Sequence, residues 1–287
     1  MVRAMWRGIA RLLGAATLVV SVLGTGEPAA AAARPAPNRP PELGVPLHVG
    51  AVLWAVAHPR HNVAASPNFL PTCAAKGWRS LACTNLAIDA IEHARVLEGL
   101  ARPLIVLPHH FSSLSVGEQT FVLTDLERTA RGLKPFAGLT SELNTASHSA
   151  AVARVDPEPV LSLLRALGIS EYGSNWAGDY GPLASDYDWM YNDGYSPSGG
   201  INLACPAPTD PGCWGHRDNI LGTYQHLPTL LAGAGTGRPA GLSIAEVMTG
   251  GNGQEPTLTY SWYDAKLDGA RNAKPRGGSP GGAIPVS

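Results

Sequence analysis

The sequence has little charge, and neither sign is in clear excess. Charged residues make up 15% of the 287 residues, with 21 Lys and Arg against 22 Asp and Glu, and the formal net charge is −1. Proteins that bind nucleic acid present a basic surface to the phosphates, so we expect no nucleic-acid partner. The chain also lacks a long apolar run, because the longest, from Leu12 to about Leu23, is shorter than the ~20 residues of a membrane-spanning helix. We therefore expect the chain not to span a membrane.

Several catalytic signatures are also missing. The sequence has no Gly-x-Ser-x-Gly nucleophile elbow and no glycine-rich phosphate loop. Its four cysteines include no Cys-x-x-Cys pair, the spacing typical of thiolate zinc sites, so a zinc site is the less favoured use of these cysteines. We predict no cofactor.

The four cysteines fall into two local couples, Cys73 with Cys83 and Cys205 with Cys213. Of the three possible connectivities we favour this local pairing. On the loop-entropy estimate each short loop would contribute about 2.5 to 3 kcal/mol to stability. Paired cysteines would also leave no thiol for a cysteine protease.

The N-terminus predicts export. Three arginines precede the apolar run, which is followed by small residues that include five consecutive alanines at 29–33. This is the pattern of a secretory signal peptide, and we assign residues 1–33 to it. Its removal leaves a net charge of about −3 on a secreted, extracellular protein, which we expect to be a monomer.

Composition and periodicity divide the rest of the chain. Residues 34–46 form a proline-rich linker, and residues 267–287, with Gly and Pro clusters and no apolar periodicity, are predicted to be a disordered tail. Between them we predict helices at 86–99, at 116–131, from Thr140 or Ser141, at 156–168 and around 182–194, and strands at 102–108, 241–250 and 258–267. Because these elements do not alternate strictly, they indicate an α+β or layered arrangement rather than a doubly wound sheet.

Two helix starts carry specific signals. Ser115 followed by Glu118 forms a capping-box pattern, with Gly132 as a suitable stop. Asp156 is the predicted cap of the helix that Gly168 ends.

Four sequence blocks, in this order, resemble the bacterial CAP superfamily (cysteine-rich secretory protein, antigen 5 and pathogenesis-related 1), also called the SCP-like domain. They are "DLERTARGLKPFAGLTSELNTASHSAA" at 125–151, "GSNWAG" at 173–178, "DWM" at 188–190 and "GHRDNIL" at 215–221. The resemblance implies a three-layer α/β/α sandwich over residues 113–266. Residues 47–112 lie outside it, and we expect them to form a helical N-terminal extension packed on the same core.

The resemblance also implies a cleft. Many CAP proteins hold two histidines and two glutamates there, which can bind a divalent metal, and His216 is similar in position to one of the histidines. Ser174 and Asn192 stand at or near the glutamate positions, so the site is degenerate. We expect no metal, with His216 as a weak candidate ligand. The expected ligand-binding cleft consists of His216, Arg217, Ser174, Asn175, Trp176 and Trp189.

Two of these sequence features, residues 215–221 and the aromatic residues that precede them, can also be explained by folding alone. Residues 215–221 read as a helix start in which Asp218 complements the helix dipole and Trp214 anchors the turn by burial. The aromatic residues between Trp176 and Tyr195 fit a core and cleft wall better than a sugar platform.

These observations favour a secreted CAP-like protein that binds an extracellular small molecule, lipid or cell-wall glycan. The alternative is a cell-wall glycan or peptide hydrolase that uses His216 and nearby carboxylates, with Glu171 and Asp179 as further catalytic candidates.

Overall fold

A computed structural model describes residues 58–59, 62, 69–101, 103–178, 181–197, 201–222, 224, 227–237, 243–254, 256–262 and 265. All of these belong to the unit formed by residues 37–287. The predicted signal peptide, the linker at 34–46 and the tail at 267–287 lie outside the described residues. In the described part of the chain, none of the helices has both the length and the apolar character needed to cross a membrane.

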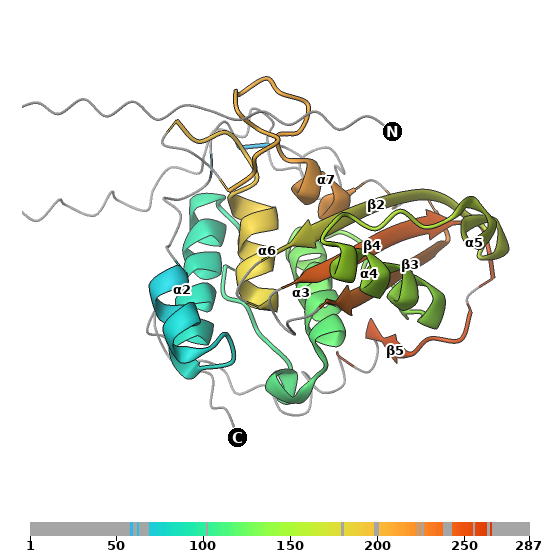
Figure 1. Ribbon diagram of the computed structural model, residues 1–287, viewed down its shortest axis with the longest axis horizontal. Helices are drawn as coiled ribbons and strands as arrows, with labels where there is room; N and C mark the ends of the chain where they lie inside the picture. The colour runs from blue at the N-terminus through green and yellow to red at the C-terminus, as the bar shows by residue number, and fades with distance from the viewer. Residues whose placement is uncertain are drawn as a thin grey trace, which may run out of the picture. The chain divides into compact units, whose positions relative to one another are not determined.

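A mixed five-stranded sheet organises the fold (Figure 1). Its strands are β1 (Gly138–Leu139), β2 (Ile169–Ala177), β3 (Thr229–Thr236), β4 (Ile244–Gly251) and β5 (Tyr260–Ser261). The spatial order is β2-β4-β3-β1-β5, in which only the β1–β3 pair is parallel. With the helices below, this sheet confirms the predicted α+β class.

Helices lie on both faces of the sheet (Figure 1). They are α2 (Leu81–Leu97), α3 (Val116–Ala130), α4 (Ser141–Ala153), α5 (Leu161–Ala166), α6 (Pro182–Tyr191) and α7 (Gly215–Leu221), with a π-helical turn η1 (Leu70–Ala74) and a 3₁₀ turn η2 (Phe111–Ser113). Leu143 of α4 packs on Leu231 and Val247, whose side chains share one sheet face. The alternate residues, such as Ala232 and Met248, face the core that contains α2, α3 and α6.

The predicted start of α3 is confirmed in detail. The Ser115 hydroxyl accepts from the Glu118 amide, and the Glu118 carboxylate accepts from the Ser115 amide, so both arms of the capping box are present. Gly132 follows the helix with φ +72°, the left-handed stop expected of a glycine. The start of α4 at Ser141, capped by Thr140, also agrees with the sequence pattern.

Two sequence predictions were wrong, and prolines explain both. Residues 103–108 are not one of the sheet's five strands; instead the Ile105 amide donates to Glu92 of α2 at 3.3 Å. Pro103 and Pro108 lack the N–H that a strand needs. Asp156 does not cap α5, which begins at Leu161 after Val160. A residue before proline is disfavoured in the helical region, so Pro157 and Pro159 keep this segment extended.

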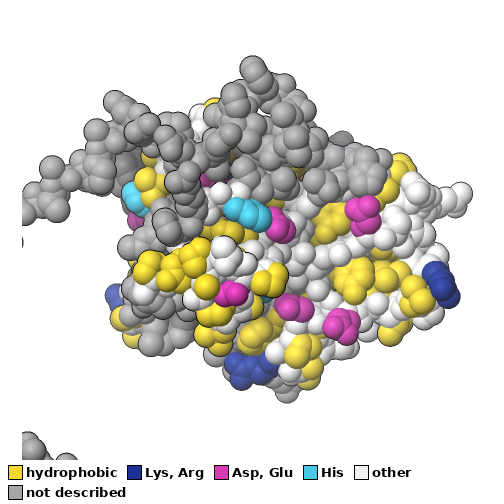
Figure 2. Space-filling view, turned by 90° about the horizontal axis from the view of Figure 1, so that it is seen from above, with side chains coloured by type: hydrophobic (Ala, Val, Ile, Leu, Met, Phe, Trp, Pro, Cys, Tyr) yellow, Lys and Arg dark blue, Asp and Glu magenta, His cyan; other side chains and the backbone are white. Residues whose placement is uncertain are grey.

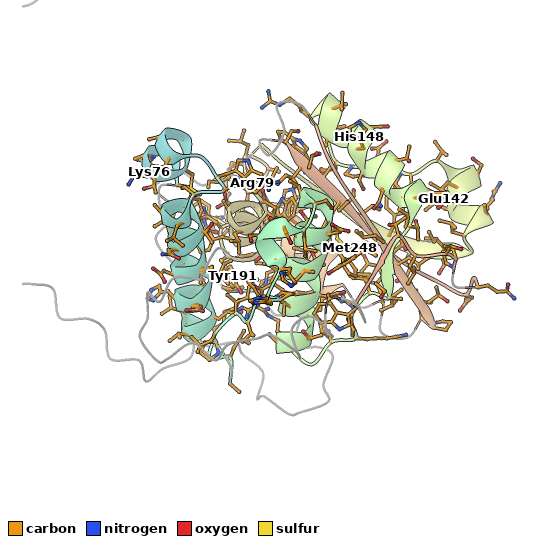
Figure 3. All side chains as sticks on the ribbon, turned by 90° about the horizontal axis from the view of Figure 1, so that it is seen from below. Lys76, Arg79, Glu142, His148, Tyr191 and Met248 are labelled. Atoms are coloured by element: carbon orange, nitrogen blue, oxygen red, sulfur yellow. A yellow bond between two sulfur atoms is a disulfide. The ribbon has the colours of Figure 1, made fainter. Side chains whose placement is uncertain are left out.

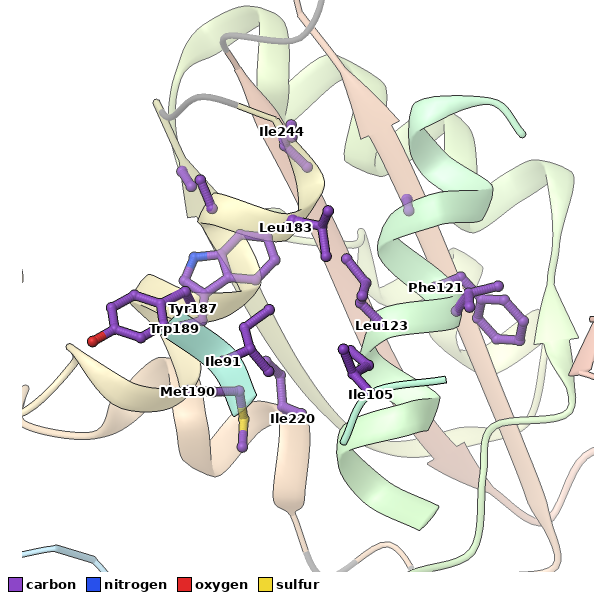
Figure 4. Close-up of a cluster of buried hydrophobic side chains, with 14 of the residues drawn as sticks. Ile91, Ile105, Phe121, Leu123, Leu183, Tyr187, Trp189, Met190, Ile220 and Ile244 are labelled. Atoms are coloured by element: carbon purple, nitrogen blue, oxygen red, sulfur yellow. The ribbon is translucent and has the colours of Figure 1, made fainter. Parts of the chain in front are cut away.

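The large aromatic residues of α6 belong to the core. Tyr187, Trp189 and Tyr191 are each at most 3% exposed and join one cluster with residues of α2 and α3, such as Ile91 and Leu123 (Figure 4). These three side chains are therefore not available to bind a sugar at the surface. The helix α2 packs into the same hydrophobic core as α3 and α6.

The structure contains both predicted disulfides. Cys73–Cys83 joins η1 to α2, and Cys205–Cys213 closes the loop directly before α7. The described residues include no free cysteine.

Candidate functional site around His216

The start of α7 is built on Asp193, which lies just beyond the end of α6. One Asp193 carboxylate oxygen, Oδ2, accepts from the backbone amides of His216 at 2.8 Å and Arg217 at 3.2 Å. Trp214, 4% exposed and in the left-handed region at φ +64°, forms the turn before the helix. A carboxylate at this position satisfies amides that have no partner within the helix and complements its dipole.

The other Asp193 oxygen holds the His216 ring. Oδ1 lies 2.7 Å from Nδ1 of His216, and the Asp193 side chain is only 1% exposed. On the far side of the ring, Nε2 lies 3.9 Å from Oδ1 of Asp156, whose side chain is 54% exposed. The His216 side chain itself is 27% exposed. The result is an imidazole fixed by a buried carboxylate and open toward a solvated one.

The two carboxylates change the acid–base behaviour of His216. Burial alone would lower the pKa of His216, but the Asp193 hydrogen bond and the charges of Asp193 and Asp156 outweigh it and raise this pKa above 6.5. Burial raises the pKa of Asp193, against the opposing effect of its hydrogen bonds. His216 is thus protonated at a higher pH than an isolated histidine.

Arg217 does not line this site. Its guanidinium turns into the interior, where it forms an ion pair with Glu98 just beyond the end of α2 and donates to the Met190 carbonyl. Glu98 also pairs with Arg131, which pairs with Glu127 of α3. This buried network fixes α7 against α2, α3 and α6, so Arg217 positions the helix that carries His216.

Of the remaining predicted cleft residues, Ser174, Asn175 and Trp176 lie on β2 and divide between its two faces, and Trp189 lies on α6. Asn175 faces α7 and donates to the His216 carbonyl at 3.2 Å. Ser174 and Trp176 alternate with it, and Trp176 packs with Ala150 and Ala151 of α4 on the opposite face. The Trp189 indole is buried and donates to the Trp176 carbonyl at 3.3 Å. The structure therefore brings only Asn175 of this set directly to His216.

The other candidates contribute less. Glu171 is exposed near the beginning of β2, whereas the His216 site adjoins the end of that strand, where the Trp176 amide hydrogen-bonds Asp156. Asp179 lies outside the described residues. Asn192 is 2% exposed and accepts from Asn62 at 2.7 Å.

Sequence reasoning did not connect either carboxylate of the site with His216. Asp193 is 23 residues from His216 and follows α6, so no local spacing links the two. For Asp156 a signal was present, because Pro157 and Pro159 follow it and keep it out of the helix, so its carboxylate is not used as a helix cap. Figure 2 shows histidine side chains beside acidic ones on the face seen from above, with Lys and Arg toward its margins.

This arrangement can share a proton and accept hydrogen bonds. Among the described residues, no group of three or more His, Cys, Asp or Glu side chains is placed to hold a metal ion. The His216 side chain is partly exposed and the Asp156 side chain is more than half exposed, so these two side chains meet solvent at this site.

No family model matches the chain, and no match is found among curated proteins or solved structures.

Proposed function

We propose that this chain is an exported CAP-like protein that binds a polar extracellular ligand at the His216 site. The order of the four sequence blocks supports the family assignment, and helices on both faces of a mixed sheet are consistent with the α/β/α sandwich that it implies. Two disulfides fit an oxidising compartment such as the cell exterior.

The geometry of Asp193, His216 and Asp156 carries the proposal. A buried carboxylate fixes the imidazole, while a solvated carboxylate 3.9 Å beyond offers acceptor atoms at the surface. The carboxylate oxygens of Asp156 and the imidazole of His216 can form hydrogen bonds with the hydroxyl groups of a glycan. Polar groups at fixed positions determine the orientation and specificity of a ligand in its site. A cell-wall glycan is therefore the ligand class we favour.

A thermal-shift screen on the mature protein tests this function. Soluble chitin and peptidoglycan oligosaccharides are the probes, and a ligand at one hundred times its dissociation constant stabilises the fold by about 2.7 kcal/mol. We expect this shift to disappear in His216→Ala and to persist in His93→Ala, which removes an exposed histidine of α2. A shift of equal size in both variants would contradict a site at His216.

One observation favours hydrolysis as a second candidate. A carboxylate that holds Nδ1 and leaves Nε2 facing outward is the arrangement by which a histidine acts as a general base. Incubation with insoluble peptidoglycan, followed by assays for released reducing ends and free amines, separates the two functions. Release that is lost in His216→Ala supports the hydrolase, whereas binding without release supports the binding protein.

Metal dependence has its own test. Since Ser174 and Asn192 replace the expected carboxylates, we expect no sub-micromolar zinc binding in calorimetric titration of the tag-free protein. One-to-one binding that is lost in His216→Ala would instead restore a metal site.

A further inference from the structure

A cavity lies apart from the His216 site. It has a volume of about 300 Å³ and is enclosed by the beginning of α2, by η2 and by the first turns of α3 and α6. Its apolar wall consists of Trp78, Cys83, Ala87, Phe111, Pro182 and Leu183. Most of these residues precede position 113, so the cavity belongs largely to the part of the chain outside the CAP resemblance.

The wall is held in place by backbone geometry and a disulfide. Gly181 has φ +95°, and a Cβ there would lie 2.5 Å from the Trp78 ring, so the indole rests directly on this glycine. Cys83 is bonded to Cys73, which fixes the first turn of α2 to η1. Ligand pockets are usually preformed in this way.

The lining of this cavity includes one permanent positive charge, the Arg79 guanidinium. Arg79 and His109 both line the cavity and are exposed, and no acidic residue lines it. The guanidinium carbon of Arg79 lies 4.4 Å from the centre of the Trp78 ring, which positions the charge beside the apolar wall. Among the described residues, neither Arg79 nor His109 has an acidic partner. Figure 3 looks onto this end of the fold, with Arg79 near α2 and α6 and Lys76 at the outer edge.

We propose that this cavity binds a small aromatic carboxylate, with the ring against the apolar wall that includes Phe111 and Leu183 and the carboxylate at Arg79 and His109. The volume is at the lower end of the range for ligand pockets and accommodates a one- or two-ring molecule. Aromatic side chains in the wall favour a ligand with an aromatic ring. The Arg79 guanidinium, which has no acidic partner among the described residues, favours a planar anion that it can bind through two hydrogen bonds. The proposal is independent of the function proposed for His216.

Calorimetric titration of the mature protein with three probes tests the proposal. The probes are 2-naphthoate, the neutral 2-naphthamide and the aliphatic acid decanoate. We expect one-to-one binding of 2-naphthoate, with 2-naphthamide about fivefold weaker, the difference that a solvent-accessible ion pair makes. Arg79→Gln should weaken 2-naphthoate by a similar factor and leave 2-naphthamide unchanged.

Matched variants locate the site. Lys76→Gln removes a nearby cation that does not line the cavity and should change neither affinity. Ser112→Trp places a bulky side chain at an exposed position on the cavity wall and should abolish binding of both naphthalene probes, with circular dichroism reporting that the variant is folded. His216→Ala should have no effect.

Four results would overturn the proposal. They are no binding of 2-naphthoate, tighter binding of decanoate than of 2-naphthoate, an affinity unchanged by Arg79→Gln, and an affinity lost in His216→Ala.

Discussion

Two carboxylates, those of Asp193 and Asp156, raise the pKa of His216. The buried one, Asp193, can be replaced by asparagine, a neutral side chain of nearly the same shape. In Asp193→Asn the imidazole loses a charged partner, so we expect the pKa of His216 to fall from its raised value. Asp218→Asn is the matched control, because Asp218 lies on the same helix but contacts His58. NMR titration of the imidazole nitrogens measures both variants, and an equal shift in each would contradict the assignment of Asp193.

The same pair links stability to pH. The folded pKa of His216 lies above the unfolded value of 6.5, so the folded state binds more protons between the two values. The pair's contribution is thus fully present below about pH 6.5 and is lost as the pH rises through the folded pKa. We expect His216→Ala to cost about 1 to 3 kcal/mol at pH 6, and less at higher pH, in urea denaturation.

Glu246 is a carboxyl group whose pKa shift makes stability fall with rising pH in the same direction, because its buried position favours the neutral form. It lies on β4 within the core, bonded to the Thr124 hydroxyl, and burial raises its pKa to about 8. The folded state therefore binds more protons than the unfolded chain between about pH 4.5 and 8, and stability falls as the pH rises through that window.

The substitution Glu246→Gln removes the ionisable carboxyl group, and with it the loss of stability at high pH. We expect the variant to be more stable than wild type at pH 8, with the difference shrinking toward pH 4.5. Glu142→Gln, at an exposed position on α4, should show no such trend. Urea unfolding at four pH values measures it, and parallel profiles for Glu246→Gln and wild type would be the contrary result.

At the scale of elements, the small residues of β3 allow a helix to pack closely on the sheet. Its sequence, TLLAGAGT, brings glycines against α4, and a Cβ on Gly233 would lie 2.3 Å from the Leu143 backbone. Gly233→Ala should force α4 outward and cost about 1 to 3 kcal/mol. Gly215→Ala, where a Cβ meets nothing within 4 Å, is the control. Equal melting temperatures for the two variants would count against this close packing.

This packing also explains what the sequence could and could not predict. The helices α3 and α4 have capping residues and apolar periodicity, which are local signals, and both were predicted. The strands β2 and β3 were missed, because glycine, alanine and polar residues replace the usual strand formers where a helix lies close to the sheet. Of the second predicted C-terminal strand, at 258–267, the described residues form a strand at Tyr260–Ser261, which pairs with the equally short β1. Asp193 and Asp156 meet His216 only through tertiary structure.

At the scale of the whole molecule, buried charges connect the N-terminal part of the chain to the His216 helix. Glu98 pairs with Arg131 and Arg217 and is 3% exposed. Glu98→Gln leaves two buried guanidinium groups without this charge, and loss of one partner of a buried pair typically costs about 3 to 5 kcal/mol. Asp89→Asn, at an exposed position on α2, should be nearly neutral.

Thermal denaturation compares these two variants, and the NMR signal of the His216 ring reports on the position of α7. We expect Glu98→Gln both to lower the melting temperature and to move the His216 signal. If Glu98→Gln behaves like Asp89→Asn in both measurements, the network does not position α7.

The measurement that tests the proposed function most directly is an NMR titration of the His216 imidazole with soluble peptidoglycan oligosaccharides. Assignment comes from the signal that is missing in His216→Ala. The proposed site predicts saturable shifts at His216, with those of the exposed His93 and His148 unchanged. A glycan that stabilises the protein while the His216 signal stays in place would contradict the proposal.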